Sequence, residues 1–211
     1  MAQDLLKGKK GIIFGALNDM SIAWKVAEQA VAQGAEIVLT NAPIAMRMGT
    51  INELAAKCNN CPVIPADATS EEDIQKLFEG AMEHFGGKID FVLHSIGMSP
   101  NVRKGRHYTD LNYKFLQTTL DVSAISLHKT LATAKKLDAL NDWGSVVALT
   151  YIAAQRTFPD YGDMADAKSL LESITRSFGY HYGVANKVRV NTISQSPTVT
   201  TAGSGVKGFD E

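Results

Sequence analysis

The sequence has almost no excess charge of either sign and no long hydrophobic run. Its 21 Lys and Arg residues nearly balance 22 Asp and Glu residues, so a formal net charge of −1 gives no long-range field for a nucleic acid or an anionic membrane. No run approaches the roughly 18 apolar residues that a membrane span needs. With 45% hydrophobic and 20% charged residues, disorder and coiled coil are excluded as well. We expect no nucleic-acid or membrane partner.

The N-terminus lacks the plan of a secretory signal. In residues 1–7 an acid, Asp4, precedes the few apolar side chains, and an expected strand begins soon afterwards at Lys10. A secretory signal instead begins with a basic segment that is followed by a longer apolar one. We therefore expect a cytoplasmic protein.

Cysteine is also scarce, and the two cysteines form one Cys-x-x-Cys motif at Cys58 and Cys61. A redox pair or half of a metal site are its functional interpretations. No second Cys or His pair follows at zinc spacing, and the motif ends an expected helix instead of opening one. We interpret the pair as two structural thiols and expect no metal site.

The organisation of the chain is a strand followed by a helix, repeated without a linker or repeat that would divide 211 residues into two domains. Short runs rich in β-branched residues, several of them apolar throughout, predict strands at 10–14, 36–40, 62–66, 89–95, 144–151 and 188–194. Apolar residues at helical spacing lie between them. We predict one α/β domain over residues 1–211, a Rossmann-type, doubly wound parallel sheet whose ligands bind at the carboxyl ends of the strands.

The first expected turn between strand and helix, residues 15–23, carries one glycine, Gly15, and so departs from the usual Gly-x-Gly-x-x-Gly fingerprint. One glycine still permits a tight turn, and the Ser21 hydroxyl and the free N–H groups of the next helix suit a pyrophosphate. Serine before an amphipathic helix is equally a common helix cap. Both interpretations of the turn stay open at this point.

Three further strand ends bear on a cofactor. After the second strand, Asn41 and Ala42 stand where a ribose-binding acid often lies, and Arg47 is the nearest cation, so the choice between NADH and NADPH is poorly determined. Asp67 after the third strand can accept a hydrogen bond from an adenine amino group or cap the following helix. Gly97 after the fourth strand permits close approach of a cofactor or serves only a turn.

Tyr161 and Lys168 lie seven residues apart in a segment, residues 160–182, that we expect to be one helix. Seven residues is almost two turns, so both side chains would share one helix face. A nearby ammonium favours the phenolate form of a tyrosine and so eases proton donation. The pair predicts a proton-delivery device, although such a pair on an arbitrary helix is usually two surface residues.

These features together resemble the short-chain dehydrogenase/reductase superfamily. Its carbonyl-reducing members carry a serine thirteen residues before the tyrosine, where this chain has Ala148, and this chain has Tyr151 ten residues before Tyr161. From about Lys7 to Phe209 the chain is similar to the NAD(P)H-dependent enoyl-[acyl-carrier-protein] reductases of bacterial fatty acid synthesis. The similarity rests on Gly15-x5-Ser21-Ile22-Ala23, His94-Ser95-Ile96-Gly97, Tyr151-x9-Tyr161-x6-Lys168 and Val188-Arg189-Val190-Asn191.

The resemblance implies a set of cofactor-binding residues. The pyrophosphate would lie against Gly15, Ser21 and Ile22, the adenine against Asp67 and Ala68, and Ile96 would contact the cofactor near its nicotinamide side. Ser95 and Gly97 are further expected cofactor-binding residues. Lys168 would hold the nicotinamide ribose, and Thr198 and Thr200 would follow the phosphates and the nicotinamide amide. NADH-preferring relatives commonly carry a glutamine at the position of Ala42. Its absence here leaves NADPH open as the cofactor, although NADH is favoured.

The resemblance also implies the catalytic residues Tyr151, Tyr161 and Lys168 and a substrate site. Tyr161 would hydrogen-bond the thioester carbonyl, Tyr151 would lie beside the reacting end of the acyl chain, and Ser99 would contact substrate through its backbone. The implied reaction passes hydride from nicotinamide C4 to the β-carbon of a trans-2-enoyl thioester. A carbonyl or alcohol dehydrogenase is the alternative, which Ala148 disfavours, and intact Tyr161 and Lys168 disfavour a non-catalytic nucleotide-binding protein.

Partners and assembly follow from the same resemblance. The acyl carrier protein is acidic, so the basic segment 103–107 is a candidate docking patch, with a solvated loop as the other interpretation. A homotetramer is implied, paired through segments 110–140 and 160–182. Relatives continue through a lid helix and a seventh strand. We therefore expect residues 198–211 to begin a substrate lid that is mobile, the final strand to be lacking, and turnover to be poor.

Overall fold

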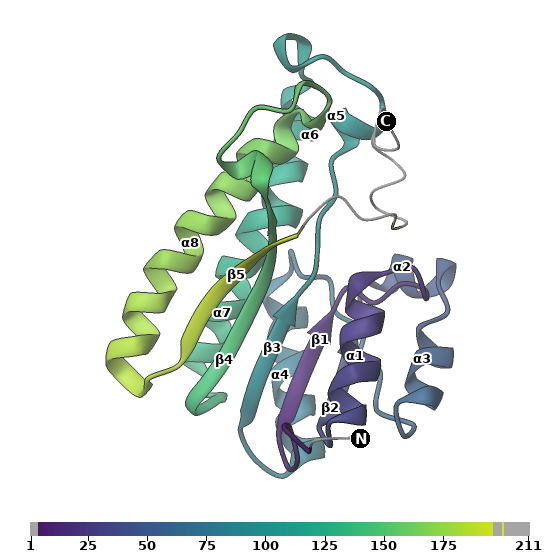
Figure 1. Ribbon diagram of the computed structural model, residues 1–211, viewed down its shortest axis with the longest axis vertical. Coiled ribbons are helices and arrows are strands. Elements are labelled where there is room, and N and C mark those ends of the chain that lie inside the picture. The colour runs from purple at the N-terminus through teal and green to yellow at the C-terminus, as the bar shows by residue number, and fades with distance from the viewer. Residues whose placement is uncertain (1–3, 196–199, 201–211) are drawn as a thin grey trace.

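The structure, a computed structural model, describes residues 4–195 and 200 and has a parallel β-sheet at its centre (Figure 1). Its strands are β1 (Lys10–Phe14), β2 (Glu36–Thr40), β3 (Ile89–His94), β4 (Leu140–Tyr151) and β5 (Arg189–Gln195). Their order across the sheet is β2-β1-β3-β4-β5, and every neighbouring pair is parallel. The chain therefore winds outward in both directions from β1 and β3, which confirms the predicted doubly wound sheet.

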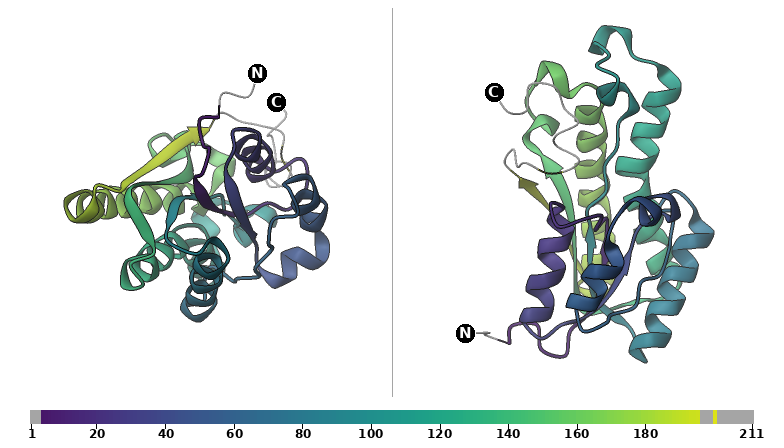
Figure 2. Two further views of the ribbon diagram at one scale, coloured as in Figure 1. Left: turned by 90° about the horizontal axis from the view of Figure 1, so that it is seen from below. Right: turned by 90° about the vertical axis from the view of Figure 1, so that its right-hand side faces the viewer.

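Helices cover both faces of this sheet, as Figure 2 shows in two further views. Helices α4 (Glu71–Phe85), α7 (Ser126–Lys136) and α8 (Asp163–Asn186) pack on one face, and α1 (Ile22–Ala32) and α3 (Ile51–Lys57) pack on the other. The shorter elements are α2 (Pro43–Met48), α5 (Pro100–Arg103), η1 (Tyr108–Asp110), α6 (Tyr113–Leu120), the π-helical turn η2 (Asp121–Ile125), η3 (Ile152–Ala154) and η4 (Pro159–Tyr161). No helix in the described part of the chain is long and apolar enough to cross a membrane.

Alternating side chains of the strands divide the interior into two cores. In β1, Ile12 and Phe14 join the core under α4, α7 and α8, and Ile13 joins the core under α1 and α3. All three side chains are at most 1% exposed. Burial on both faces explains why these strands read as unbroken apolar runs in the sequence.

The predicted third strand at residues 62–66 is wrong. Only Val63 forms a bridge to Leu39 of β2, and the segment otherwise runs beside the sheet edge as irregular chain. Two prolines, Pro62 and Pro65, lie in the segment and have no N–H to donate to a ladder. The segment still reaches the carboxyl end of β2, where Ala66 N donates to Asn41 O at 3.1 Å.

The expected helix over residues 160–182 begins later than predicted. Tyr161 ends the 3-10 turn η4, Gly162 stands at the N-cap with φ 51° and ψ −139°, and α8 begins at Asp163. A positive φ is accessible to glycine because it has no Cβ. Tyr161 and Lys168 therefore do not share one helix face, because Gly162 turns the chain between the tyrosine and the helix.

The two cysteines bound a tight turn after α3. Cys61 N donates to Cys58 O at 3.1 Å, and the two intervening asparagines have positive φ. Cys58 is buried and Cys61 half-buried, and burial raises the pKa of the Cys61 thiol to about 12. Both observations support two structural thiols, since a thiol with so high a pKa is a poor nucleophile and metal ligand at neutral pH.

Candidate active site

The turn after β1 is fixed by one glycine. Gly15 has φ 92°, and a Cβ built on it would lie 2.0 Å from the carbonyl oxygen of Ser95. A side chain at this position would therefore both strain the backbone and clash with the end of β3. The close approach joins two predicted site residues, Gly15 and Ser95, and leaves the turn packed directly on the neighbouring strand.

Ser21 stands at the N-cap of α1 but does not cap it. Its hydroxyl accepts hydrogen bonds from Leu17 N at 3.2 Å and Asn18 N at 3.4 Å and donates to Asn18 O. The first turn of α1 thus receives no hydrogen bond from this side chain, and it contains no acidic residue. An uncapped, uncompensated helix start of this kind suits an anion such as pyrophosphate, so the structure favours that interpretation of the turn over the plain cap.

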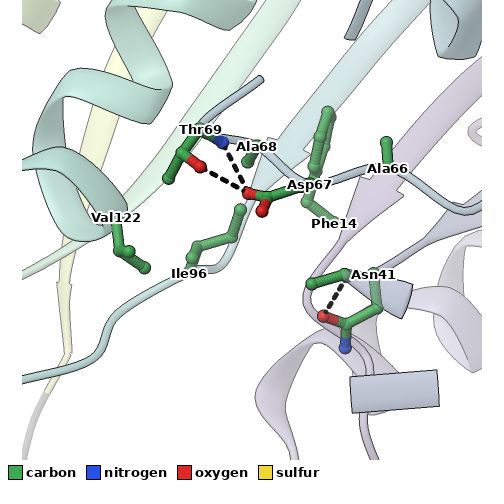
Figure 3. A pocket seen from close by; sticks show the side chains of 9 residues that line it. Phe14, Asn41, Ala66, Asp67, Ala68, Thr69, Ile96 and Val122 are labelled. Carbon is green, nitrogen blue, oxygen red and sulfur yellow. Dashed lines mark hydrogen bonds between the residues drawn. The ribbon is translucent and has the colours of Figure 1, made fainter. Parts of the chain in front are cut away.

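A pocket opens at the carboxyl ends of β1 and β2, beside the predicted adenine residues (Figure 3). Asp67 lies at one wall, where its carboxylate accepts from Thr69 N at 2.9 Å and Thr69 Oγ1 at 2.7 Å. Asp67 is not the cap of α4, because Ser70 takes that role by accepting from Asp73 N. The pocket is lined by Phe14, Asn41, Ala42, Ala66, Asp67, Ala68, Thr69, Ile96 and Val122.

Several pocket residues were missing from the sequence prediction. Phe14 and Asn41 lie at or just after the ends of strands, and that position was an available signal. Asn41 fixes the adjoining turn by donating from Nδ2 to Ala16 O at 3.0 Å. No sequence pattern indicated Val122, because it reaches the pocket from the π-helical turn η2. The position of a π-helical turn cannot be predicted from apolar spacing in the sequence.

Lys168 lies near the carboxyl end of β4. Its Nζ donates to Leu149 O of β4 at 2.7 Å, and the side chain is 7% exposed. A Cβ built on Gly97 would lie 3.7 Å from this Nζ, so the turn after β3 runs directly past the ammonium. Burial lowers the pKa of Lys168 to about 8. Ile96, between Ser95 and Gly97, lines the pocket beside Asp67 and Ala68, whereas the sequence predicts it near the nicotinamide side of the cofactor.

His94 is a second buried ionisable group near Lys168. Its Nε2 lies 2.9 Å from Ser126 Oγ, and Ser126 in turn donates to Val122 O at 2.7 Å. Burial, and then the charge of Lys168, lower the pKa of His94 to about 3. His94 is therefore neutral at physiological pH, and Lys168 supplies the positive charge at this position.

The two tyrosines form a ring pair above this edge. The ring centroids of Tyr151 and Tyr161 are 4.8 Å apart at an interplanar angle of 45°. Burial, and then the neighbouring Tyr151, raise the pKa of Tyr161 well above its usual value. The expectation that the Lys168 ammonium favours a phenolate is therefore wrong: loss of solvation dominates, and Tyr161 stays a neutral hydrogen-bond donor.

The remaining predicted positions fall as follows. Ser99 is buried and caps α5, its hydroxyl donating to Asp163 Oδ1 and accepting from Val102 N, so this hydroxyl is already engaged within the chain. Ala148 is fully buried in the core under α4, α7 and α8, so its β-carbon points away from solvent. Thr200 is buried, and Thr198 and most of the expected lid, residues 198–211, lie outside the described residues.

Comparison with known families and proteins gives a consistent result. The family model described as "Enoyl-(Acyl carrier protein) reductase" matches residues 15–211. The enoyl-[acyl-carrier-protein] reductase [NADH] FabI of Rickettsia bellii is 36% identical over 211 residues, which is all of this chain and 78% of the relative. The corresponding enzyme 1 of Rhizobium meliloti is 35% identical over 99% of this chain and 75% of its own.

Solved structures agree with these relatives. The FabI–NADH complex from Alistipes finegoldii has a TM-score of 0.96 and 69% identity, covering 98% of this chain and 73% of that one. The enoyl-[acyl-carrier-protein] reductase (NADH) from Aquifex aeolicus has a TM-score of 0.88 and 29% identity, covering 98% and 79%. The five-stranded parallel sheet thus has close counterparts in crystal structures.

Proposed function

The chain belongs to the enoyl-(acyl carrier protein) reductase family, and we propose that it reduces trans-2-enoyl thioesters carried by acyl carrier protein to saturated thioesters, with NADH, in fatty acid synthesis. The observation that carries the proposal is the ring pair of Tyr151 and Tyr161 beside the same sheet edge as the buried Lys168. Carbonyl reductases of the superfamily instead carry a serine thirteen residues before the tyrosine. In this chain that position is Ala148, which is buried, so the tyrosine pair favours an enoyl reductase over a carbonyl reductase.

The residues at the sheet edge fit NADH. An adenine ring suits the apolar walls of the pocket, with Asp67 available as a hydrogen-bond acceptor, and the pyrophosphate suits the uncapped start of α1 after Gly15 and Ser21. Lys168 would hold the nicotinamide ribose near Gly97. NADH supplies the hydride for the β-carbon of the substrate.

The chain's own contribution is to stabilise the negative charge that gathers on the thioester oxygen. Tyr161 is neutral and can donate its phenolic O–H to that oxygen. Below pH 8 Lys168 adds a positive charge in a site screened from water. Preorganised donors and charges of this kind stabilise a transition state by about 3–4 kcal/mol per donor. Tyr151, at the end of β4, forms the wall against the reacting end of the acyl chain.

The proposal extends to the assembly of the protein and its location in the cell. We infer a cytoplasmic homotetramer in which α6, α7 and α8 form one contact. Exposed apolar side chains on α6 and α8 support it, since Tyr113 is 76%, Tyr180 68% and Val184 73% exposed. The acyl carrier protein would dock at residues 103–107, which are exposed beyond the carboxyl end of β3.

An absorbance assay at 340 nm tests the function. We expect NADH oxidation with crotonyl thioester and none with a 3-ketoacyl thioester, and Tyr161→Phe should remove most of the first activity. Oxidation with the 3-ketoacyl substrate alone would assign the chain to the carbonyl reductases instead. NADH binding without oxidation by either substrate would support a non-catalytic nucleotide-binding protein.

A further inference from the structure

A buried carboxylate, that of Asp163, lies two residues beyond Tyr161. Asp163 is 0% exposed and is the first residue of the 24-residue helix α8. Its Oδ1 accepts from Ser99 Oγ at 2.6 Å, and its Oδ2 accepts from Asn101 Nδ2 at 2.7 Å and from Thr119 Oγ1 at 2.9 Å. A charge buried this deeply persists only when donors surround it, and the positive end of the helix dipole adds to them.

The three donors come from two other elements. Ser99 caps α5 and Asn101 lies within it, and Thr119 is in the last turn of α6. Each of the three side chains is at most 4% exposed. Asp163 therefore joins the starts of α8 and α5 to the end of α6 at one buried point. In Figure 1, α5 and α6 lie at the end of the molecule toward which β3 and β4 run.

The same cluster closes the loop between α5 and α6. Asn101 Oδ1 accepts from Asn112 N at 3.0 Å, and its Nδ2 also lies 3.2 Å from Asn112 O. Asn112 in turn caps α6 by accepting from Lys114 N and Phe115 N. The segment from Ser99 to Asn112 is thereby held at both ends, and the acid anchors it through Asn101.

The tyrosine is coupled to this anchor through the backbone. Tyr161, Gly162 and Asp163 are consecutive, and a Cβ built on Gly162 would lie 3.3 Å from Val102 Cγ2 of α5. Gly162 alone separates the phenol from the anchored residue. A displacement of Asp163 would move the tyrosine and the backbone of Met98 and Ser99 relative to each other.

We propose that Asp163 is a positioning residue: its buried carboxylate fixes the Tyr161 turn against the segment 98–101, so that the phenol and the substrate-facing backbone keep one geometry. The inference rests on the proposed function, because it assigns Asp163 a task in the reduction that Tyr161 performs. Displacing a reacting group by about 1 Å can lower a rate by about a hundredfold.

The test compares two isosteric changes on one helix. In Asp163→Asn the new NH2 group replaces either Oδ1, which accepts from one donor, or Oδ2, which accepts from two, so at least one donor loses its acceptor. In the control, Asp166→Asn, the same change is made one turn later, at a half-buried acid whose oxygens both lie 3.2 Å from the Tyr108 hydroxyl. We expect kcat with crotonyl thioester to fall about tenfold in Asp163→Asn, with the dissociation constant for NADH within twofold of wild type, and both constants to stay within twofold in Asp166→Asn.

A milder variant guards against misfolding. Thr119→Val removes one donor and keeps the carboxylate, and we expect kcat to fall about threefold with unchanged NADH binding. Amide hydrogen exchange over residues 98–112 should quicken in Asp163→Asn and not in Asp166→Asn, a readout that needs no turnover. An unchanged kcat, or equal losses of kcat and NADH affinity, would overturn the positioning role. Absence of turnover in the wild type, with the exchange difference intact, would overturn the proposed function and not the anchor.

Discussion

At the residue scale, burial controls the ionisation of the two central site residues in opposite ways. It lowers the pKa of Lys168 to about 8, because a buried ammonium loses solvation, and it raises the pKa of Tyr161 because a buried phenolate would lose solvation too. Around neutral pH the lysine is mostly charged and the tyrosine neutral. Lys168 therefore supplies a positive charge and Tyr161 a hydrogen-bond donor, and the phenol of Tyr161 is not ionised.

The ionisation of Lys168 predicts the pH dependence of NADH binding. Below about pH 8 the ammonium is present and favours the anionic cofactor; as the pH rises through 8 the free protein loses this charge. We expect the dissociation constant for NADH to rise severalfold between pH 7 and pH 9.5, measured by fluorescence titration. Lys168→Met should bind more weakly at pH 7 and show no such step. A step of equal size in this variant would assign the titration to another group.

The neutral state of Tyr161 predicts a selective loss of turnover. Tyr161→Phe removes the donor to the thioester oxygen and leaves the cofactor contacts in place, so we expect kcat to fall about 10²–10³-fold with NADH affinity unchanged. Lys168→Ala should instead weaken both turnover and NADH binding. The check is steady-state kinetics beside a binding titration, and equal NADH affinity in wild type and the lysine variant would contradict the assignment of Lys168.

At the scale of single elements, the turn from β1 to α1 depends on the absence of a Cβ. Gly15→Ala introduces backbone strain at φ 92° and a clash with Ser95 O, whereas Gly8→Ala, at φ 71°, meets nothing within 4 Å. We expect Gly8→Ala to cost about 1 kcal/mol in the free energy of unfolding and Gly15→Ala about 1–3 kcal/mol more, with loss of NADH binding. Urea unfolding of both variants measures the difference, and equal costs would show that the contact with Ser95 relaxes freely.

The basic loop after α5 gives a prediction for the carrier protein. Arg106 lies 3.4 Å from Asp110, and Lys104 lies over the Phe115 ring, so both cations already have partners in the chain, and Arg103 is exposed. Replacing Arg103 and Arg106 by Gln should raise KM severalfold for carrier-bound substrate and leave KM for a coenzyme A substrate unchanged.

Kinetics with both substrates at low and moderate salt provide the comparison. The exposed Lys76 of α4, changed to Gln, is the matched surface control. Equal losses on the two substrates would place carrier docking elsewhere.

At the scale of the whole molecule, the outer face of α8 is the candidate for self-association. Tyr180 and Val184 lie four residues apart on this helix and are 68% and 73% exposed. We expect Tyr180→Glu combined with Val184→Glu to lower the molar mass measured by light scattering, because two carboxylates would be buried in the contact. Met48→Glu, at an 81% exposed position on α2, should leave the mass unchanged. A double variant with the wild-type mass would exclude this face.

Sequence alone determined the fold class, and it predicted a set of site residues at the carboxyl edge of the sheet. Strands buried on both faces need apolar runs, and a turn that allows no Cβ needs glycine, so β1, β2 and the Gly15 turn could be predicted directly. The residues at strand ends had to meet at one sheet edge because parallel strands share their direction. The predictions of Tyr151, Tyr161 and Lys168 as catalytic residues rest on their spacing and on the family resemblance.

The tertiary structure decided what depends on neighbours distant in the chain. Residues 62–66 form only one isolated bridge to β2 instead of a strand, and Val122 reaches the pocket from a π-helical turn. Tyr161 lies outside α8 because the chain turns at Gly162. Burial also raises the pKa of Tyr161, whereas its spacing from Lys168 predicted a lowered pKa. The physical reason is the same in each case: hydrogen-bond partners, solvation and close contacts are supplied by other segments, and local sequence patterns carry no record of them.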